Sequence, residues 1–186
     1  MKKRYKVGMV IGRFQPFHCG HQRVIEEALE VCNTVIVVIG SAQESRVFHN
    51  PLTAQERENM IRDCFYDELE LNPNCIKFLH LADREDVSND ASWGEYVMNE
   101  IEHKFHVSPG VVFEGYESAR QDWYDSLDIT VVQISRNIIP ISGAELRNAI
   151  WFDNRERYNE WCATGTQEWY VYLKEVLKEC KRRQKQ

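Results

Sequence analysis

The sequence lacks an apolar run long enough to cross a membrane, which takes about 20 consecutive apolar residues in a helix. Its basic start at residues 1–4 has the charge of a signal-peptide n-region. The apolar run behind it is too short for a signal peptide, and Arg13 interrupts the chain soon after that run. We therefore expect a cytoplasmic protein that has no membrane partner.

Cysteine pairs at the spacing of metal ligands are also missing, although the chain has 6 cysteines. With no secretion signal beside them, we expect reduced thiols rather than disulfides. Cys19 lies in a loop between two histidines, and it could act as a nucleophile. No general base is specifically assigned to it, however, and nucleophilic catalysis needs one.

An excess of positive charge is absent, since 23 Lys and Arg face 29 Asp and Glu. The net charge of −6 argues against general nucleic-acid binding, and the basic residues 181–185 suit the solvated end of a helix. There are no internal repeats, low-complexity segments or linkers. We expect residues 1–186 to form one domain, with a core at 1–150, a helical segment at 151–186 and no second enzyme domain.

The sequence does contain an alternation of strand and helix patterns. Short apolar runs predict strands at residues 7–11, 35–39, 76–81, 111–113 and 129–132, with Gly12, Gly40 and Gly115 ending three of them. Helical spacing predicts helices at 21–32, 53–69, 91–105, 142–150 and 155–181, the last with a break near 164–166. Such alternation is typical of an α/β fold with a parallel sheet.

In parallel sheets, ligands bind beyond the carboxyl ends of the strands. This rule selects five loops, at residues 12–21, 40–52, 82–92, 114–123 and 135–145. The 12–21 loop carries His18-Cys-Gly-His21, a pattern expected by chance in about one of a hundred such chains. It stands where a strand passes into a helix N-terminus, which favours bound anions. Two imidazoles and Arg13 there suggest phosphate chemistry, and a zinc-binding histidine pair is the alternative.

Two further loops carry polar residues at helix starts. Ser142-Gly-Ala-Glu145 predicts a capping box, with Arg147 one turn later and able to reach a phosphate; a surface arginine is the simpler interpretation. Ser41 and Gln43 follow the second strand, and Asn50 and Thr53 are either ligand contacts or turn and cap residues.

Trp93 follows the polar loop at residues 83–90, where an aromatic side chain could stack on a flat ring. Its helical spacing with Val97, Ile101 and Phe105 favours a place in the core instead.

Together these blocks resemble a known family. The segment Gly12-Arg-Phe-Gln-Pro-Phe-His-Cys-Gly-His21 is similar to the signature of archaeal-type nicotinamide-nucleotide (NMN) adenylyltransferases, which belong to the HxGH nucleotidylyltransferase superfamily. The similarity continues, in the same order across about residues 6–150, in the blocks 39–43, 50–57 and 142–147. The resemblance implies a Rossmann-like parallel sheet of about five strands flanked by helices.

The resemblance also implies a reaction, in which ATP and nicotinamide mononucleotide give NAD and pyrophosphate, with Mg²⁺ bound through the ATP phosphates. It implies that His18, His21, Arg13 and Arg147 are catalytic. The implied ATP contacts are Gly12, Arg13, Phe14, His18, Gly20, His21, Ser142, Gly143 and Arg147. The implied mononucleotide contacts are Ser41, Gln43, Asn50, Thr53, Trp93, which would stack on nicotinamide, and Asp86, with Asp83 as an alternative position. Relatives also associate, so a homo-oligomer is expected.

Two departures from the family pattern are visible. Glu114-Gly-Tyr-Glu-Ser118 replaces a Ser-Gly-Asn-Pro block and leaves the adenine and ribose contacts of the 114–123 loop open, and Ala144 replaces the usual threonine. Other acceptors remain alternatives, namely nicotinate mononucleotide, phosphopantetheine and flavin mononucleotide, as does cytidylyl transfer. A regulator that binds nucleotide without turnover is a further alternative.

Overall fold

The computed structural model describes residues 3–84, 91–116, 124–125, 127–135 and 140–184. Its five strands are β1 (Tyr5–Gly12), β2 (Cys32–Ile39), β3 (Ile76–His80), β4 (Val111–Tyr116) and β5 (Thr130–Ser135). Its helices are α1 (Cys19–Val31), α2 (Ala54–Arg62), α3 (Ala91–Phe105), α4 (Gly143–Trp151), α5 (Arg155–Trp161) and α6 (Trp169–Arg183), with a π-helix, η1 (Asp63–Glu68), continuing α2.

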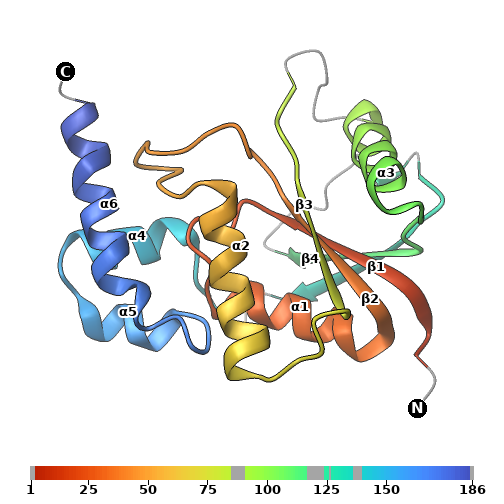
Figure 1. The fold of residues 1–186 in the computed structure, drawn as a ribbon, viewed down its shortest axis with the longest axis horizontal. Coiled ribbons are helices and arrows are strands. Elements are labelled where there is room, and N and C mark those ends of the chain that lie inside the picture. Colours follow the sequence, from red (N-terminus) through yellow and green to blue (C-terminus); the bar gives the residue numbers. More distant parts are fainter. Residues whose placement is uncertain (1–2, 85–90, 117–123, 126, 136–139, 185–186) are drawn as a thin grey trace.

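The strands form one parallel sheet in the order β3-β2-β1-β4-β5 (Figure 1). The chain first moves outward from β1 to β3 and then returns to the other side of β1. The strand order therefore reverses between β1 and β4, and a ligand crevice is expected outside the carboxyl ends of these two strands. The predicted α/β class and parallel five-stranded sheet are confirmed.

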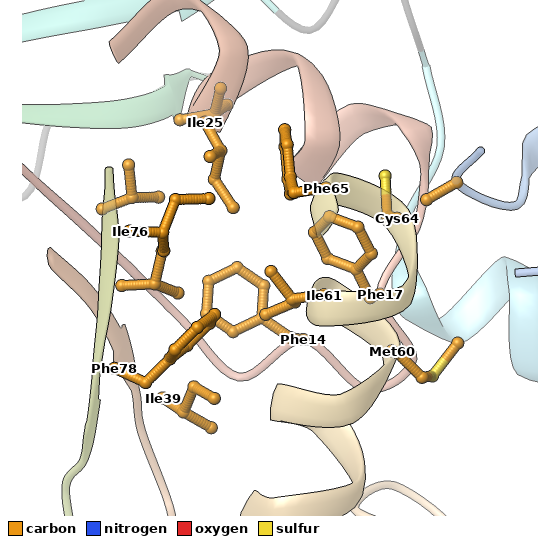
Figure 2. Close-up of a cluster of buried hydrophobic side chains, with 14 of the residues drawn as sticks. Phe14, Phe17, Ile25, Ile39, Met60, Ile61, Cys64, Phe65, Ile76 and Phe78 are labelled. Atoms are coloured by element: carbon orange, nitrogen blue, oxygen red, sulfur yellow. The ribbon is translucent and has the colours of Figure 1, made fainter. Parts of the chain in front are cut away.

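Helices cover both faces of the sheet, because parallel strands with apolar residues on both sides must be buried on both sides. Helix α3 packs on one face through Val97 and Ile101. Helices α1, α2, α4 and α6 share the larger core on the other face (Figure 1). In that core Phe14 and Phe17, from the loop after β1, lie among side chains of α1, α2, η1 and the strands (Figure 2).

Some predicted boundaries are wrong. The helix expected at 53–69 is α-helical only to Arg62 and continues as the π-helix η1, in which the Leu69 N–H donates to the Cys64 carbonyl at 3.2 Å. Gly115 does not end β4, because it still pairs with Ile134 of β5. Strand β5 accordingly runs beyond its apolar start to Ser135, as an edge strand that tolerates polar residues.

The C-terminal helices pack against the α/β core. The predicted break near 164–166 is confirmed, because α5 ends at Trp161 and α6 begins at Trp169. The Gln22 side chain of α1 exchanges two hydrogen bonds with Thr164, at 2.9 and 3.0 Å. The Trp169 indole donates to Asp63 at 2.6 Å. None of the helices in the described ranges is long and apolar enough to cross a membrane.

Candidate nucleotide-binding site

The loop between β1 and α1 is anchored by aromatic side chains. Phe14 and Phe17 are almost fully buried, and they flank the turn at residues 15–16. His18 follows Phe17 directly and is the N-cap of α1. The His18 and His21 rings stack with 3.7 Å between their centroids, and the Phe14 ring meets His21 edge-on at 4.9 Å. The predicted junction of strand and helix is therefore confirmed, and packing holds both imidazoles in place at the helix N-terminus.

The start of α4 is locked to this loop. Ser142 and Glu145 form the predicted capping box. A Cβ atom at Gly143 would lie 2.7 Å from the Gln15 carbonyl oxygen, so no larger residue fits without displacing the loop. The Arg147 guanidinium donates a hydrogen bond to the same carbonyl. The two sequence blocks, more than a hundred residues apart, thus meet at Gln15.

A cavity of about 330 Å³ opens between these elements. It lies at the carboxyl ends of β1, β4 and β5, beside the point where the strand order reverses. All nine residues predicted to contact ATP line it: Gly12, Arg13, Phe14, His18, Gly20, His21, Ser142, Gly143 and Arg147. The structure therefore brings this whole predicted set together around one space.

The cavity has the charge of an anion site. Burial and, after it, the neighbouring positive charge of Arg13 lower the pKa of Arg147 to about 10, so the Arg147 guanidinium still carries its charge at neutral pH. The Arg147 Nε is buried and has no hydrogen-bond partner among the described residues. Arg13 and Arg147 line one cavity together with the N-termini of α1 and α4. This arrangement favours a bound polyanion, which would offset the cost of bringing like charges together.

The loop after β2 is tied to the loop after β1. The buried Gln15 amide donates to the Leu52 carbonyl at 2.7 Å and accepts from the Leu52 N–H at 3.0 Å. Ser41 and Asn50 are buried, and Thr53 caps α2. The Asn50 Oδ1 has no hydrogen-bond partner in the described part of the chain, while its amide nitrogen donates to Glu44.

The remaining mononucleotide candidates lie toward β3 and α3. Gln43 and Asp83 exchange two hydrogen bonds, at 3.1 and 2.9 Å. Trp93 is half-buried on α3, with its ring 5.6 Å from that of Tyr96. Asp86 lies outside the described residues. None of the five described candidates, which are Ser41, Gln43, Asn50, Thr53 and Trp93, lines the 330 Å³ cavity.

Sequence reasoning missed several residues of the site. Arg57 is fully buried and binds the backbone of both loops, although it ends the conspicuous block 50–57. Arg23 and Glu27 form an ion pair on α1 and line the cavity, a pair that their i, i+4 spacing could have indicated. Phe113 adds an apolar wall from β4.

Two alternatives for the 12–21 loop lose support. Burial raises the pKa of the Cys19 thiol to about 11, so it is protonated at neutral pH and a poor nucleophile. Within the described residues, no group of three or more His, Cys, Asp and Glu is placed to hold a metal ion, which a zinc site built on His18 and His21 would need.

Comparison with known proteins agrees with this geometry. The cytidylyltransferase-like family profile matches residues 9–160. The nicotinamide/nicotinic acid mononucleotide adenylyltransferase of Acinetobacter baylyi is 32% identical over 143 residues, which are 76% of this chain and 73% of that protein. The nicotinamide-nucleotide adenylyltransferase of Archaeoglobus fulgidus is 37% identical over 91 residues, 49% of this chain and 52% of that protein. The match thus spans about half the length of this archaeal relative.

Among solved structures, a bifunctional NMN adenylyltransferase/ADP ribose pyrophosphatase from Francisella tularensis, complexed with AMP and a manganese ion, superimposes with a TM-score of 0.72. The superposition covers 97% of this chain and 53% of that one at 19% identity, and it supports the fold alone. The profile matches most of this chain, and the Acinetobacter baylyi relative matches 76% of it, so the chain belongs to the cytidylyltransferase-like family.

Proposed function

We propose that the protein transfers the adenylyl group of ATP to nicotinamide mononucleotide, giving NAD and pyrophosphate. The observation that carries the proposal is the cavity between α1 and α4, where His18, His21, Arg13 and Arg147 gather around one space. Phosphoryl-type transfer depends mostly on positioning and on charge stabilisation, and these residues supply both. The names of the relatives supply the substrates.

In the proposed mechanism, an oxygen of the mononucleotide phosphate attacks the α-phosphorus of ATP in line. A P–O bond forms there while the bond from the α-phosphorus to the bridging oxygen breaks, and the electron pair leaves with pyrophosphate. The nucleophile is already an anion, so the step needs no general base and no covalent intermediate. ATP enters as its Mg²⁺ complex, in which the metal neutralises part of the polyphosphate charge.

Each residue around the cavity receives a role from its position. His21 and His18 donate to phosphate oxygens from the start of α1, with His21 nearest the transferred group. Arg13 and Arg147 hold the polyphosphate, and the unpartnered Arg147 Nε supplies one more donor. Backbone at Gly12, Phe14, Gly20 and Gly143 and the Ser142 hydroxyl complete the ATP site.

The mononucleotide would bind next to this cavity, against the loop after β2. That loop contains four of the proposed contact residues, which are Ser41, Gln43, Asn50 and Thr53, and the Trp93 ring would stack on the nicotinamide. Asn50 Oδ1 is an acceptor that is still unpartnered in the described chain, so it can receive a donor such as a carboxamide N–H.

We also propose that the protein acts in the cytoplasm as a homo-oligomer.

The proposal is tested with purified protein, ATP, Mg²⁺ and a panel of phosphorylated acceptors, scored for pyrophosphate and dinucleotide. The panel holds nicotinamide mononucleotide, nicotinate mononucleotide, phosphopantetheine and flavin mononucleotide. We expect NAD from nicotinamide mononucleotide. The absence of NAD would contradict the proposal, and ATP binding without any product would favour a nucleotide-sensing regulator.

A further inference from the structure

Arg57, on the first turns of α2, is the largest fully buried side chain in the described structure. Its guanidinium donates to four backbone carbonyls. Nη1 donates to those of Arg13 at 2.8 Å and Gly40 at 2.6 Å, Nη2 to that of Ser41 at 3.2 Å, and Nε to that of Thr53 at 3.2 Å. The side chain therefore binds the loop after β1 and the loop after β2 at the same time.

These carbonyls stand where the backbone of both loops is strained. Phe14, which follows Arg13, has φ of 52°, and Ser41, which follows Gly40, has φ of 47°. Residues other than glycine rarely adopt this left-handed conformation and keep it only where surrounding contacts impose it. Hydrogen bonds from one rigid guanidinium to the carbonyls beside both positions provide such contacts.

The planar fork of an arginine is needed for this arrangement. Burial lowers the pKa of Arg57 to about 10, so the side chain remains a cation at neutral pH. Four carbonyl dipoles compensate its charge, no carboxylate of the described residues forms a salt bridge with it, and Asp83 and Glu56 add attraction from a greater distance. A lysine ammonium is a compact point charge with three donors on one nitrogen. It cannot replace a guanidinium whose Nε, Nη1 and Nη2 each donate to a different backbone carbonyl or pair of carbonyls.

We propose that Arg57 is a positioning residue for adenylyl transfer, which fixes the loop that holds the ATP phosphates relative to the loop that holds the mononucleotide. The inference rests on the function proposed above. Arg57 is fully buried and is not among the residues that line the cavity, so it acts through Arg13, which does line the cavity, and through Ser41. A misplacement of about 1 Å between reacting groups can cost about a hundredfold in rate.

The first test compares Arg57→Lys and Arg57→Met with Arg62→Lys, a matched control on the same helix whose side chain is 44% exposed and pairs with Glu58. Activity is assayed well below the melting temperature of each variant. The stoichiometry of Mg²⁺-ATP binding, measured by calorimetric titration, gives the fraction of chains that are competent to bind. We expect kcat per competent chain to fall about a hundredfold in both Arg57 variants and to stay within twofold in the control.

A purely structural role would lower the melting temperature and the competent fraction but leave kcat per competent chain within threefold of the wild type, and this result would overturn the proposal. Full recovery of kcat in Arg57→Lys would also overturn it, because charge alone would then suffice. An inactive wild type would instead contradict the proposed function.

A second measurement uses the wild-type protein, in case the Arg57 variants do not fold. The arginine Nε–Hε resonances are followed by ¹⁵N NMR while Mg²⁺-ATP or nicotinamide mononucleotide is added separately. We expect the Arg57 resonance to shift with each substrate and the Arg62 resonance to shift with neither. If the Arg57 resonance responded to neither substrate, or to only one, Arg57 would not connect the two loops.

Discussion

At the scale of single residues, Arg147 has hydrogen-bonding capacity that the protein itself does not use. Its buried Nε has no partner in the described structure, and its pKa is lowered by burial and by Arg13. Both features cost stability in the empty protein. A polyanion in the cavity would remove both costs, which ties the fold of this region directly to ligand binding.

His21 gives the sharpest mutational test at this scale. Its ring is held between Phe14 and His18 at the first turn of α1. We expect His21→Ala to lower kcat by about 10² to 10³-fold, because a donor to developing phosphate charge is lost. Steady-state kinetics with both substrates saturating measures this. His103→Ala, on an exposed position of α3, is the control, and near-normal turnover in His21→Ala would show that the site is misassigned.

Cys19 should be dispensable although it stands between the two histidines. Burial raises its thiol pKa to about 11, and the proposed chemistry needs no protein nucleophile. We expect Cys19→Ala to retain kcat within about threefold and iodoacetamide to modify Cys19 slowly at pH 7. A loss of activity comparable to that of His21→Ala would mean that the thiol takes part in catalysis.

At the scale of elements, α2 and α6 together hold the loop after β2. Arg46 donates two hydrogen bonds to Glu56, at 2.6 and 2.8 Å, and another to the Pro51 carbonyl at 2.8 Å. Glu56 also completes the capping box of α2 with Thr53 and accepts a hydrogen bond from the Tyr172 hydroxyl of α6. The C-terminal helix therefore supports a loop that we assign to the mononucleotide.

This network predicts a pH dependence of stability. Burial raises the pKa of Glu56, but hydrogen bonds from Arg46, Tyr172 and Thr53 outweigh it and lower the pKa to about 2, from 4.5. A carboxylate with a lowered folded-state pKa contributes stability above its unfolded pKa and loses it as the pH falls to the folded value. The contribution of Glu56 to the free energy of unfolding should thus be full above about pH 5 and vanish near pH 2.

The check is urea unfolding of the wild type and Glu56→Gln at several pH values between 3 and 7. The difference in unfolding free energy should be constant above pH 5 and shrink below pH 4.5. Glu160→Gln, which removes a half-exposed partner of Arg157, should show no such trend. A difference between wild type and Glu56→Gln that does not depend on pH would contradict the assignment.

Helix α3 places Trp93 on the face of the sheet opposite α1. It is half-buried against Tyr96, so its ring has both a packed and an accessible part. We expect Trp93→Ala mainly to raise the KM for the mononucleotide, because a stacking platform is lost. An effect confined to the KM for ATP would move Trp93 to another role.

At the scale of the whole molecule, the C-terminal helices share the core of the α/β part. Tyr158, Leu173 and Leu177 lie in the same buried cluster as Ile25 and Ile61. We propose that residues 1–186 form one domain, and we expect thermal unfolding to be a single transition that coincides by far-UV circular dichroism and by tryptophan fluorescence. An earlier fluorescence transition would instead indicate a separately folding C-terminal segment.

The sequence alone determined the local features of this protein. Apolar runs and helical spacing predicted all five strands and most helices. The capping box predicted at Ser142 is present, and Thr53, one of the possible cap residues, caps α2. These signals can be read from the sequence because they act between residues close in the chain. Boundaries failed where pairing with a distant segment decided them. Strand β4 continues through Gly115 because β5 lies beside it, which no local pattern records.

The tertiary structure alone decided how the motifs meet. The sequence indicated His18 and Arg147 as candidates. Only the folded chain brings the Gln15 carbonyl, in the loop before His18, to the place where it accepts a hydrogen bond from Arg147. The clearest case is Arg57, to which the sequence assigned no role and which is fully buried and hydrogen-bonded to four backbone carbonyls. Its partners are set by how two loops curve after neighbouring strands, and that curvature depends on packing across the whole sheet rather than on any short stretch of chain.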